Sequence, residues 1–295
     1  MDSFSNYNPI VNFIYFTAVI VFSMFFMHPI FQIIAIIAAL TYSIILKGRK
    51  AIRFNLIYIL PLLIFMAIIN PLFNHAGATI LFYFKSGNPF TLESMIYGIA
   101  AAIMFVTVIL WFSCYNEIMT SDKIIYIFGN IIPSLSLIFS MVLRFVPRYI
   151  EQIQIISNSQ KAIGRDMSQG NIIQRAKNGL KILSIMITWA LENSIETADS
   201  MRARGYGLPG RTSFSIFKFD KRDKIVLGLS LILISIIVFG AFKGENTIRF
   251  FPSIKIPEIT GFSLLIYISY FLLCMMPIII NIQEAIKWKS IESKI

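Results

Sequence analysis

Charged residues are scarce in this sequence, and their scarcity excludes most soluble globular folds. Asp, Glu, Lys and Arg make up only 14% of the 295 residues, whereas a soluble domain carries about 25%. Hydrophobic residues make up 57%, and the mean hydropathy is +0.74. Apolar runs near the length needed to cross a bilayer recur along the chain. The composition therefore predicts an all-α, polytopic helical membrane protein.

Cysteine and histidine are also rare, which argues against a metal centre or a disulfide framework. Cys114 and Cys274 lie within apolar segments, His28 precedes a proline at a turn, and His75 lies in a polar loop. Residues scattered this widely match no zinc-ligand spacing. We therefore expect no metal, no cofactor and no disulfide, with both cysteines buried as small apolar side chains.

The sequence lacks motifs that would let the chain bind ATP or catalyse a reaction by itself. The sequence contains no G-x-x-x-x-G-K-[ST] phosphate loop and no H-E-x-x-H, and its external loops hold no Ser-His-Asp set. Its apolar segments are almost free of Asp, Glu and His, which ion-coupled transporters bury in their spans. Glu93 and Glu117 lie at segment ends. We therefore expect a non-catalytic chain that depends on partner proteins for energy.

Loops between the apolar segments carry a charge pattern that indicates their side of the membrane. Basic residues gather after the second segment, between Arg144 and Lys224, and near the C-terminal end, which favours the cytoplasm for these regions. The first ten residues contain no Lys or Arg, so we expect the first apolar segment to be retained rather than cleaved as a signal peptide. The segments are 11–27, 29–46, 54–73, 95–115, 124–142, 225–242 and 262–282.

Segment 124–142 conflicts with this assignment. Gly129, Asn130 and Pro133 interrupt it. If every apolar segment before residue 143 crossed the membrane, Arg144 and the basic region after it would lie outside, against the positive-inside rule. We therefore expect one of the early segments not to cross fully, and the sequence leaves open which one.

Residues 143–223 differ from the rest of the chain, because they carry much of its charge and no run long enough to span. We predict three domains: N-terminal membrane helices (1–142), a cytoplasmic helical insert (143–223) and C-terminal membrane helices (224–295). Within the insert, apolar residues recur at three- and four-residue steps, which predicts one stripe of a long amphipathic helix. The stripe consists of Ile172, Ala176, Leu180, Leu183, Ile187, Leu191, Ile195 and Ala198.

Two helix ends of similar design lie in this insert, QKAIGRD (160–166) and ADSMRARGYG (198–207). Glycine after a basic last turn is a common helix stop, because glycine accepts the left-handed cap position and a cation suits the negative end of the helix dipole. An arginine at a helix end is also a rigid five-donor fork that suits carboxylates and carbonyls in a partner's groove. Both interpretations stay open at this level.

With flanking spans and no ATPase motif, these ends make the chain resemble the transmembrane T component of energy-coupling factor transporters, which import vitamins and metal ions into prokaryotes. The residues that carry the resemblance are RFVPRYIEQIQIISNSQKAIG (144–164) and ETADSMRARGYG (196–207). The resemblance implies a plasma-membrane protein whose insert couples two ABC ATPase subunits to a separate, small, hydrophobic substrate-binding subunit. The substrate is therefore not readable from this chain.

In that family each of two helices ends in an Ala-Arg-Gly motif whose arginine docks in a groove of one ATPase subunit. Carried over residue by residue, the second motif of this chain is complete in Ala203, Arg204 and Gly205. Arg202 adds a further cation directly before it. The resemblance thus implies that this helix end grips one of the two ATPases.

The first motif departs from the family pattern. Ala162 and Gly164 match it, but Ile163 stands at the arginine position. We expect Lys161 or Arg165 to supply the charge instead, at a shifted angle around the helix end. The resemblance therefore implies two ATPase contacts that are unequal.

Three other functions stay open on the residues alone. An intramembrane enzyme with its site in the external loop 74–94 would use His75, Lys85 and Glu93. A conventional ABC permease would need polar residues facing inward across several spans, and the sequence shows few. The net charge of +11 also admits nucleic acid. Lys and Arg are confined to loops beside apolar spans. We therefore expect this positive charge to reflect the lipid bilayer and not binding to nucleic acid.

Overall fold

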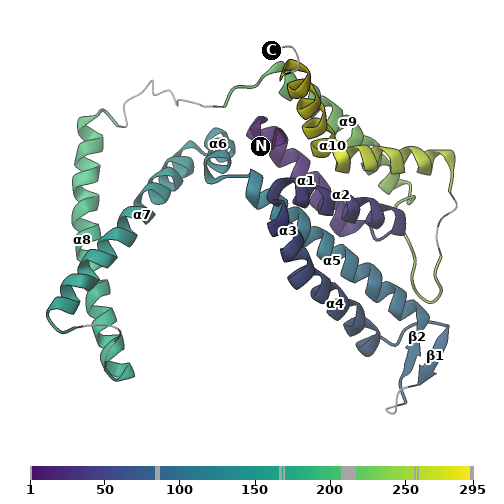
Figure 1. Cartoon of the computed structure of the whole chain (residues 1–295), viewed down its shortest axis with the longest axis horizontal. Helices are drawn as coiled ribbons and strands as arrows, with labels where there is room; N and C mark the ends of the chain where they lie inside the picture. The colour runs from purple at the N-terminus through teal and green to yellow at the C-terminus, as the bar shows by residue number, and fades with distance from the viewer. Residues whose placement is uncertain are drawn as a thin grey trace. The chain divides into compact units, whose positions relative to one another are not determined.

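Helices form most of the chain in the structure, a computed structural model that describes residues 2–83, 87–165, 168, 170–206, 217–255, 257 and 259–292 (Figure 1). The chain divides into two compact units. We call Met1–Ile124 with Phe217–Ile295 the membrane unit, and Ile125–Ile216 the insert unit. The prediction of an all-α polytopic protein is confirmed, with one small strand pair added in the described part of the chain.

In its described residues, the membrane unit contains five helices that are long and apolar enough to cross a bilayer. A shorter apolar helix, α1, has 17 residues and extends over about 25 Å. In the third span a π-helical turn, Asn55–Ile59, precedes Pro61, and the helix continues past this proline as α4. The helices of this unit are α1 (Pro9–Phe25), α2 (Pro29–Lys47), α3 (Arg49–Phe54), α4 (Leu60–Phe73), α5 (Leu92–Ile118), α9 (Lys221–Phe242) and α10 (Gly261–Glu292).

Local sequence signals explain where the first two helices begin. Asn8 caps α1, because its side-chain oxygen accepts from the N–H of Ile10 at 3.0 Å, and a proline occupies the first helical position. His28 caps α2 in the same way, with Nδ1 accepting from the N–H of Ile30 at 3.4 Å. The predicted turn at His28 is confirmed, and the side chain of this histidine has a local hydrogen-bonding role.

Aromatic side chains fill the centre of the membrane unit. Tyr15, Phe16, Phe31, Trp111 and Tyr270 are almost wholly buried there. Their rings meet mainly edge to face, an arrangement that stabilises aromatic pairs beyond the area they bury. The two cysteines are free thiols buried in this core, as predicted.

The helix ends of the membrane unit form two groups that differ in their number of basic residues. One group contains the start of α1 and α9 and the end of α2, α5 and α10; the other contains the turn before α2, the end of α4 and the start of α5 and α10. Lys and Arg are concentrated in the first group, which predicts that it faces the cytoplasm. Its basic residues include Lys47, Arg49, Lys50, Arg53, Lys123, Lys221, Arg222, Lys224, Lys287 and Lys289.

The conflict over segment 124–142 is resolved by a break in the helix. A short helix, α6 (Ser121–Ile131), ends one residue before α7 (Pro133–Ala162) begins. Ile132 between them has φ −135° and ψ 84°, because helical geometry is disfavoured in the residue before a proline. With 11 residues, α6 extends over only about 17 Å. This segment therefore does not form a single spanning helix.

The insert unit is built on two long helices, α7 and α8 (Ile172–Ala203). They cross where Ile156 of α7 meets Ile182 and Met186 of α8 in a small buried cluster. Beside it, the rings of Tyr149 and Trp189 meet edge to face at 5.7 Å. The predicted long helix is confirmed. Its predicted apolar stripe does not pack against α7; a neighbouring face of α8 makes that contact.

We expect cysteine labelling in intact cells to test the side assignment. The natural cysteines are buried, so the unmodified chain should not react with a membrane-impermeant maleimide. Ser253→Cys lies in the exposed loop between α9 and α10 and should label, whereas Lys50→Cys and Lys181→Cys should label only after the membrane is opened. Labelling of residue 181 in sealed cells would place the insert outside and contradict the assignment.

Candidate functional site

Helix α7 ends in a complete Schellman motif at the first predicted site. Gly164 has φ 77°, the left-handed conformation that glycine adopts without strain. Its N–H donates to the carbonyl of Lys161 at 3.0 Å, and the N–H of Arg165 donates to the carbonyl of Gln160 at 2.9 Å. These two bonds satisfy carbonyls that the helix leaves unbonded. Ile163 is the helix cap between Ala162 and the glycine.

Helix α8 ends in the same motif at the second site. Gly205 also has φ 77°, and its N–H donates to the carbonyl of Arg202 at 3.0 Å. The N–H of Tyr206 donates to the carbonyl of Met201 at 3.0 Å. Arg204 is the cap residue that follows Ala203. The two helix ends therefore have one backbone conformation, and their residues can be matched position by position.

This match shows how the two ends differ in chemistry. Ile163 of the first end corresponds to Arg204 of the second, and Lys161 corresponds to Arg202. The remaining cation of the first end, Arg165, stands two residues after the cap, where the second end has a tyrosine. Each end thus presents a cation one turn before its glycine. Only the second end presents one at the cap itself.

The predicted site residues are exposed or half-exposed, which leaves them accessible to a partner. Lys161, Ala162, Arg165, Arg202 and Ala203 are exposed, and so is Arg204. Ile163 exposes 62% of its surface, a large value for an isoleucine at the end of a helix. We call Lys161–Arg165 the first tip and Arg202–Gly205 the second tip.

The two tips are separated by the length of a long helix. The connection after α7 leads directly into the start of α8, so the second tip lies at the far end of α8 from the first (Figure 1). The 32 residues of α8 extend over about 48 Å. The structure therefore does not bring the predicted site residues into one pocket. It presents two separate contact points.

The apolar stripe of α8 is exposed along most of its length. Its larger members expose between 51% and 79% of their surface, which is unusual for a soluble helix that has no partner. Ile182 and Met186 on the neighbouring face pack against α7. The stripe is therefore a second apolar surface of α8, separate from that contact. We call it the α8 stripe; its large members are Ile172, Leu180, Leu183, Ile187, Leu191 and Ile195.

Residues of the external loop 74–94 have structural roles in the described part of that loop. A hairpin of β1 (Ile80–Tyr83) and β2 (Pro89–Thr91) forms there. The carboxylate of Glu93 is buried and accepts from the N–H of Thr79 at 3.1 Å and 3.2 Å, which fastens the hairpin to α5. Gly77 passes so close that an added Cβ would lie 2.5 Å from that carboxylate. Lys85 lies outside the described residues, and His75 is half-exposed.

Sequence reasoning missed this hairpin and the role of Gly77. The signal was present only weakly, as the phenylalanines 82 and 90, whose rings stack at 4.6 Å across the strands. Among the described residues, no group of three or more His, Cys, Asp or Glu side chains is placed to hold a metal ion.

Comparisons with known proteins point to transport. The family model described as cobalt transport protein (CbiQ) matches residues 5–214, which include both tips. The energy-coupling factor transporter transmembrane protein EcfT of Brevibacillus brevis is 29% identical over 218 residues, covering 69% of this chain and 77% of that protein. The protein of the same name from Leuconostoc gelidum is 30% identical over 195 residues, covering 62% of this chain and 70% of that protein.

Shorter alignments link the chain to further proteins of that name. EcfT of Lactobacillus helveticus is 32% identical over 117 residues, which cover 39% of this chain and 42% of that protein. EcfT of Lacticaseibacillus paracasei is 33% identical over 108 residues, which cover 36% and 41%. The alignments with these two relatives thus span about two fifths of the relatives' length.

We expect Gly164→Ala and Gly205→Ala to loosen the tips, because an L-residue in the left-handed conformation costs about 1–2 kcal/mol. Amide hydrogen exchange of the capping N–H groups of Arg165 and Tyr206 should accelerate about tenfold. Gly228→Ala is the matched control, since Gly228 lies in α9 without positive φ and with open space around its Cβ position. Unchanged exchange in both tip variants would show that the glycines do not hold the caps.

Proposed function

This chain belongs to the cobalt transport protein family, and from that membership we propose that it is the transmembrane coupling subunit of an energy-coupling factor importer. It is a multi-pass protein of the prokaryotic plasma membrane. In this proposal it has no catalytic activity of its own, and ATP is hydrolysed by partner chains. The cargo is a vitamin or a metal ion, bound by a separate subunit.

The observation that carries the proposal is the pair of tips. Two exposed helix ends each close in a cap with the same hydrogen-bond pattern, and each presents cations beside its cap. A cap closed by its own glycine holds the last turn rigid, and the glycine leaves room for a partner's backbone to approach. Arg204 at the second tip offers five N–H donors in a fixed plane, which suits carboxylates and carbonyls in a groove of an ABC ATPase.

The two ATPase contacts are unequal in this proposal. The groove that receives the second tip faces a cation at the cap, whereas the groove that receives the first tip faces Ile163 there. Because Ile163 is largely exposed in the free chain, its docking removes apolar surface from water. Lys161 and Arg165 then supply the charge on either side of it. The first groove is therefore expected to be apolar at its centre and acidic at its rim.

Crossed helices suit the transmission of motion from the ATPases. Nucleotide-driven closing would move the two tips, which lie at the ends of α7 and α8, while the helices stay joined where Tyr149 and Trp189 meet. Arg148 lies 5.7 Å from the Trp189 ring and adds a cation–π contact at the crossing. A displacement at the tips would then turn the helices about this crossing, in the manner of a hinge between packed helices.

The α8 stripe is the surface that we assign to the substrate-binding subunit. It is apolar, continuous along the helix and not used in the contact between α7 and α8. A small hydrophobic membrane protein is a partner of matching chemistry. If the two surfaces stayed apart, their apolar area would remain exposed to water or lipid headgroups. Turning α8 would then move this surface together with the bound subunit.

Neither the conventional permease nor the enzyme in the external loop is favoured by a specific observation. A conventional permease would route its cargo through the membrane unit, whose centre is filled by side chains such as Trp111 and Tyr270. An enzyme in loop 74–94 would need a reactive Glu93, but hydrogen bonds to the hairpin already occupy that carboxylate.

We expect Arg204→Ala to release the ATPase partner. The truncated contact should cost about 2–5 kcal/mol if the arginine docks in a groove, but only about 0.3–1 kcal/mol if it merely ends a helix. The measurement is recovery of ABC ATPase chains with the tagged protein, purified in mild detergent from its own cells and quantified by mass spectrometry. Arg175→Ala, an exposed arginine near the other end of α8, is the matched control and should retain them.

Two results would contradict the proposal. One is a natural chain that comes away without ABC ATPases in a detergent known to preserve such complexes. The other is an Arg204→Ala chain that retains them as fully as the Arg175→Ala chain. In the second case Arg204 would be a helix stop only, and the grip on the ATPase would have to lie elsewhere on the insert.

A further inference from the structure

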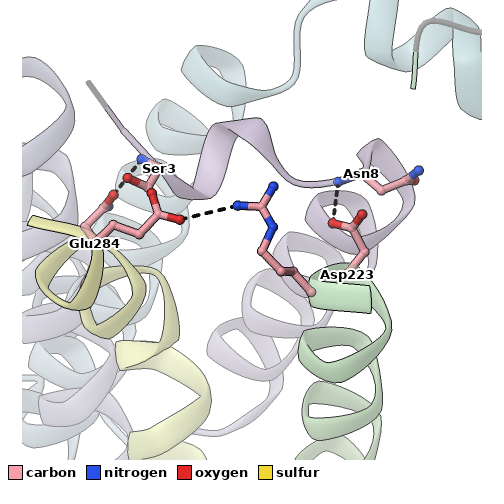
Figure 2. Close-up of polar contacts among 6 residues, drawn as sticks. Ser3, Asn8, Asp223 and Glu284 are labelled. Atoms are coloured by element: carbon pink, nitrogen blue, oxygen red, sulfur yellow. Dashed lines mark hydrogen bonds and ion pairs between the residues drawn. The ribbon is translucent and has the colours of Figure 1, made fainter. Parts of the chain in front are cut away.

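Residues 2–8 lie across one end of the membrane unit, and we call them the strap. The same end holds the two segments that connect the membrane unit to the insert unit. We call residues 119–124 the entry segment and residues 217–224 the exit segment. Figure 2 shows Ser3 and Asn8 of the strap near Glu284 of α10 and Asp223 of the exit segment.

The beginning of the strap is fastened to α10 and α2. Asn281 accepts from the N–H of Ser3 at 2.7 Å, and its amide nitrogen donates to the carboxylate of Asp2. The hydroxyl of Tyr42 donates to the same carboxylate at 3.2 Å. Phe4 is fully buried in the core, with its ring edge to face against Tyr15 at 5.1 Å. This part of the strap is therefore a fixed point of the membrane unit.

The middle of the strap holds the entry segment through Lys123. The ammonium group of Lys123 donates to the carbonyl of Ser5 at 2.5 Å. Asn12 of α1, with its amide turned to satisfy both partners, accepts from the same ammonium group at 3.2 Å and donates to the carbonyl of Phe4 at 3.1 Å. Only 7% of Lys123 is exposed, although lysine is among the residues least often buried.

The end of the strap holds the exit segment through Asp223. One carboxylate oxygen of Asp223 accepts from the N–H of Asn8 at 3.0 Å, and the other accepts from the N–H of Asp220 at 2.8 Å. Asp223 is 5% exposed. Next to it, Arg222 forms an ion pair with Glu284 at 3.6 Å (Figure 2). Arg222 also lies 5.8 Å from the ring of Tyr7. The exit segment is thus bonded to the strap and to α10.

We propose that the strap positions the insert for coupling, because it joins the entry and exit segments to each other and to the core of the membrane unit. Lys123 and Asp223 are the positioning residues on the two sides. The chain connects the insert unit to the membrane helices at these two segments, where the insert unit begins and ends. If they moved independently, part of the displacement would be lost as local bending. The strap links them, so that both move with the bundle.

The burial of Lys123 supports a positioning role over a stabilising one. Burial lowers the pKa of Lys123, and the negative charge of Asp2 only partly opposes this. Removing a charge from water is costly even when hydrogen bonds compensate it, and such groups are often better explained by the geometry they specify than by stability. The ammonium group reaches a carbonyl of the strap that a shorter or apolar side chain would leave without this bond.

The proposal rests on the proposed function for its purpose, but its geometry is testable on the full chain without any partner. We expect Lys123→Met, in lipid nanodiscs, to accelerate amide exchange about tenfold in the strap and also in the exit segment, at the N–H groups of Asn8, Asp220 and Lys224. The reciprocal variant, Asp223→Asn, should accelerate exchange in the entry segment. Peptide-level mass spectrometry resolves these segments.

Lys47→Met is the matched control for both variants. Lys47 lies at the same end of the membrane unit and bonds to Ser113 at 2.8 Å and to Glu117 at 3.7 Å, without touching the strap. Its loss should leave exchange in the strap, entry and exit segments unchanged. Exchange that rises only in the mutated segment would overturn the proposal, because the two segments would then be independent. If one variant fails to fold, the other still gives this comparison.

A second readout separates positioning from mere stability. In the complex purified from the source cells and placed in vesicles, Lys123→Met should retain its ATPase chains and ATP hydrolysis but lose at least fivefold in cargo imported per ATP, whereas Lys47→Met should lose nothing. An unchanged import ratio would overturn the positioning role. Absence of ATPases from the natural complex would instead refute the proposed function and leave the exchange result to be judged separately.

Discussion

Each helix leaves backbone groups unbonded at its ends, and in a bilayer no water is available to satisfy them inside the hydrocarbon. This constraint places the polar chemistry of the protein at helix ends. In the membrane unit, side chains satisfy the backbone groups at helix ends. Asn8 caps α1 and His28 caps α2. Asp223 accepts hydrogen bonds from the strap and from the start of α9. In the insert unit Gly164 and Gly205 let α7 and α8 close their own last turns.

The interior that remains is apolar and aromatic, and this limits what the chain does alone. Tyr15, Phe16 and Trp111 interlock edge to face at the centre of the membrane unit, where an ion-coupled transporter would bury carboxylates. In the proposed function, energy enters through partner chains, and the exposed tips are the contacts that we assign to them. Family membership and the two matched caps both support the proposed division of labour between a membrane subunit and ATP-hydrolysing partners.

Matched backbone and unmatched side chains make the two tips a natural comparison. Because Ile163 and Arg204 occupy the same cap position, the two grooves that we propose as their partners should differ in chemistry rather than in the backbone that they receive. The length of α8 keeps the tips apart, and the crossing at Trp189 joins the two helices. In our proposal, motion applied at either tip reaches the membrane unit through the segments that Lys123 and Asp223 hold at the strap.

Composition and local periodicity determined the class of protein, most of the spans and both glycine-ended helices, because these features depend on neighbours within a few turns. The break at Pro133 was visible as an interruption, but its effect on the topology needed the structure. Tertiary contacts alone decided which face of α8 packs, how Gly77 approaches Glu93, and how the strap meets Lys123 and Asp223. These contacts join residues far apart in the chain, so no local pattern encodes them. Hydrophobic periodicity predicts a helix and its apolar stripe. The element that packs on that stripe is decided only by contacts between distant parts of the folded chain.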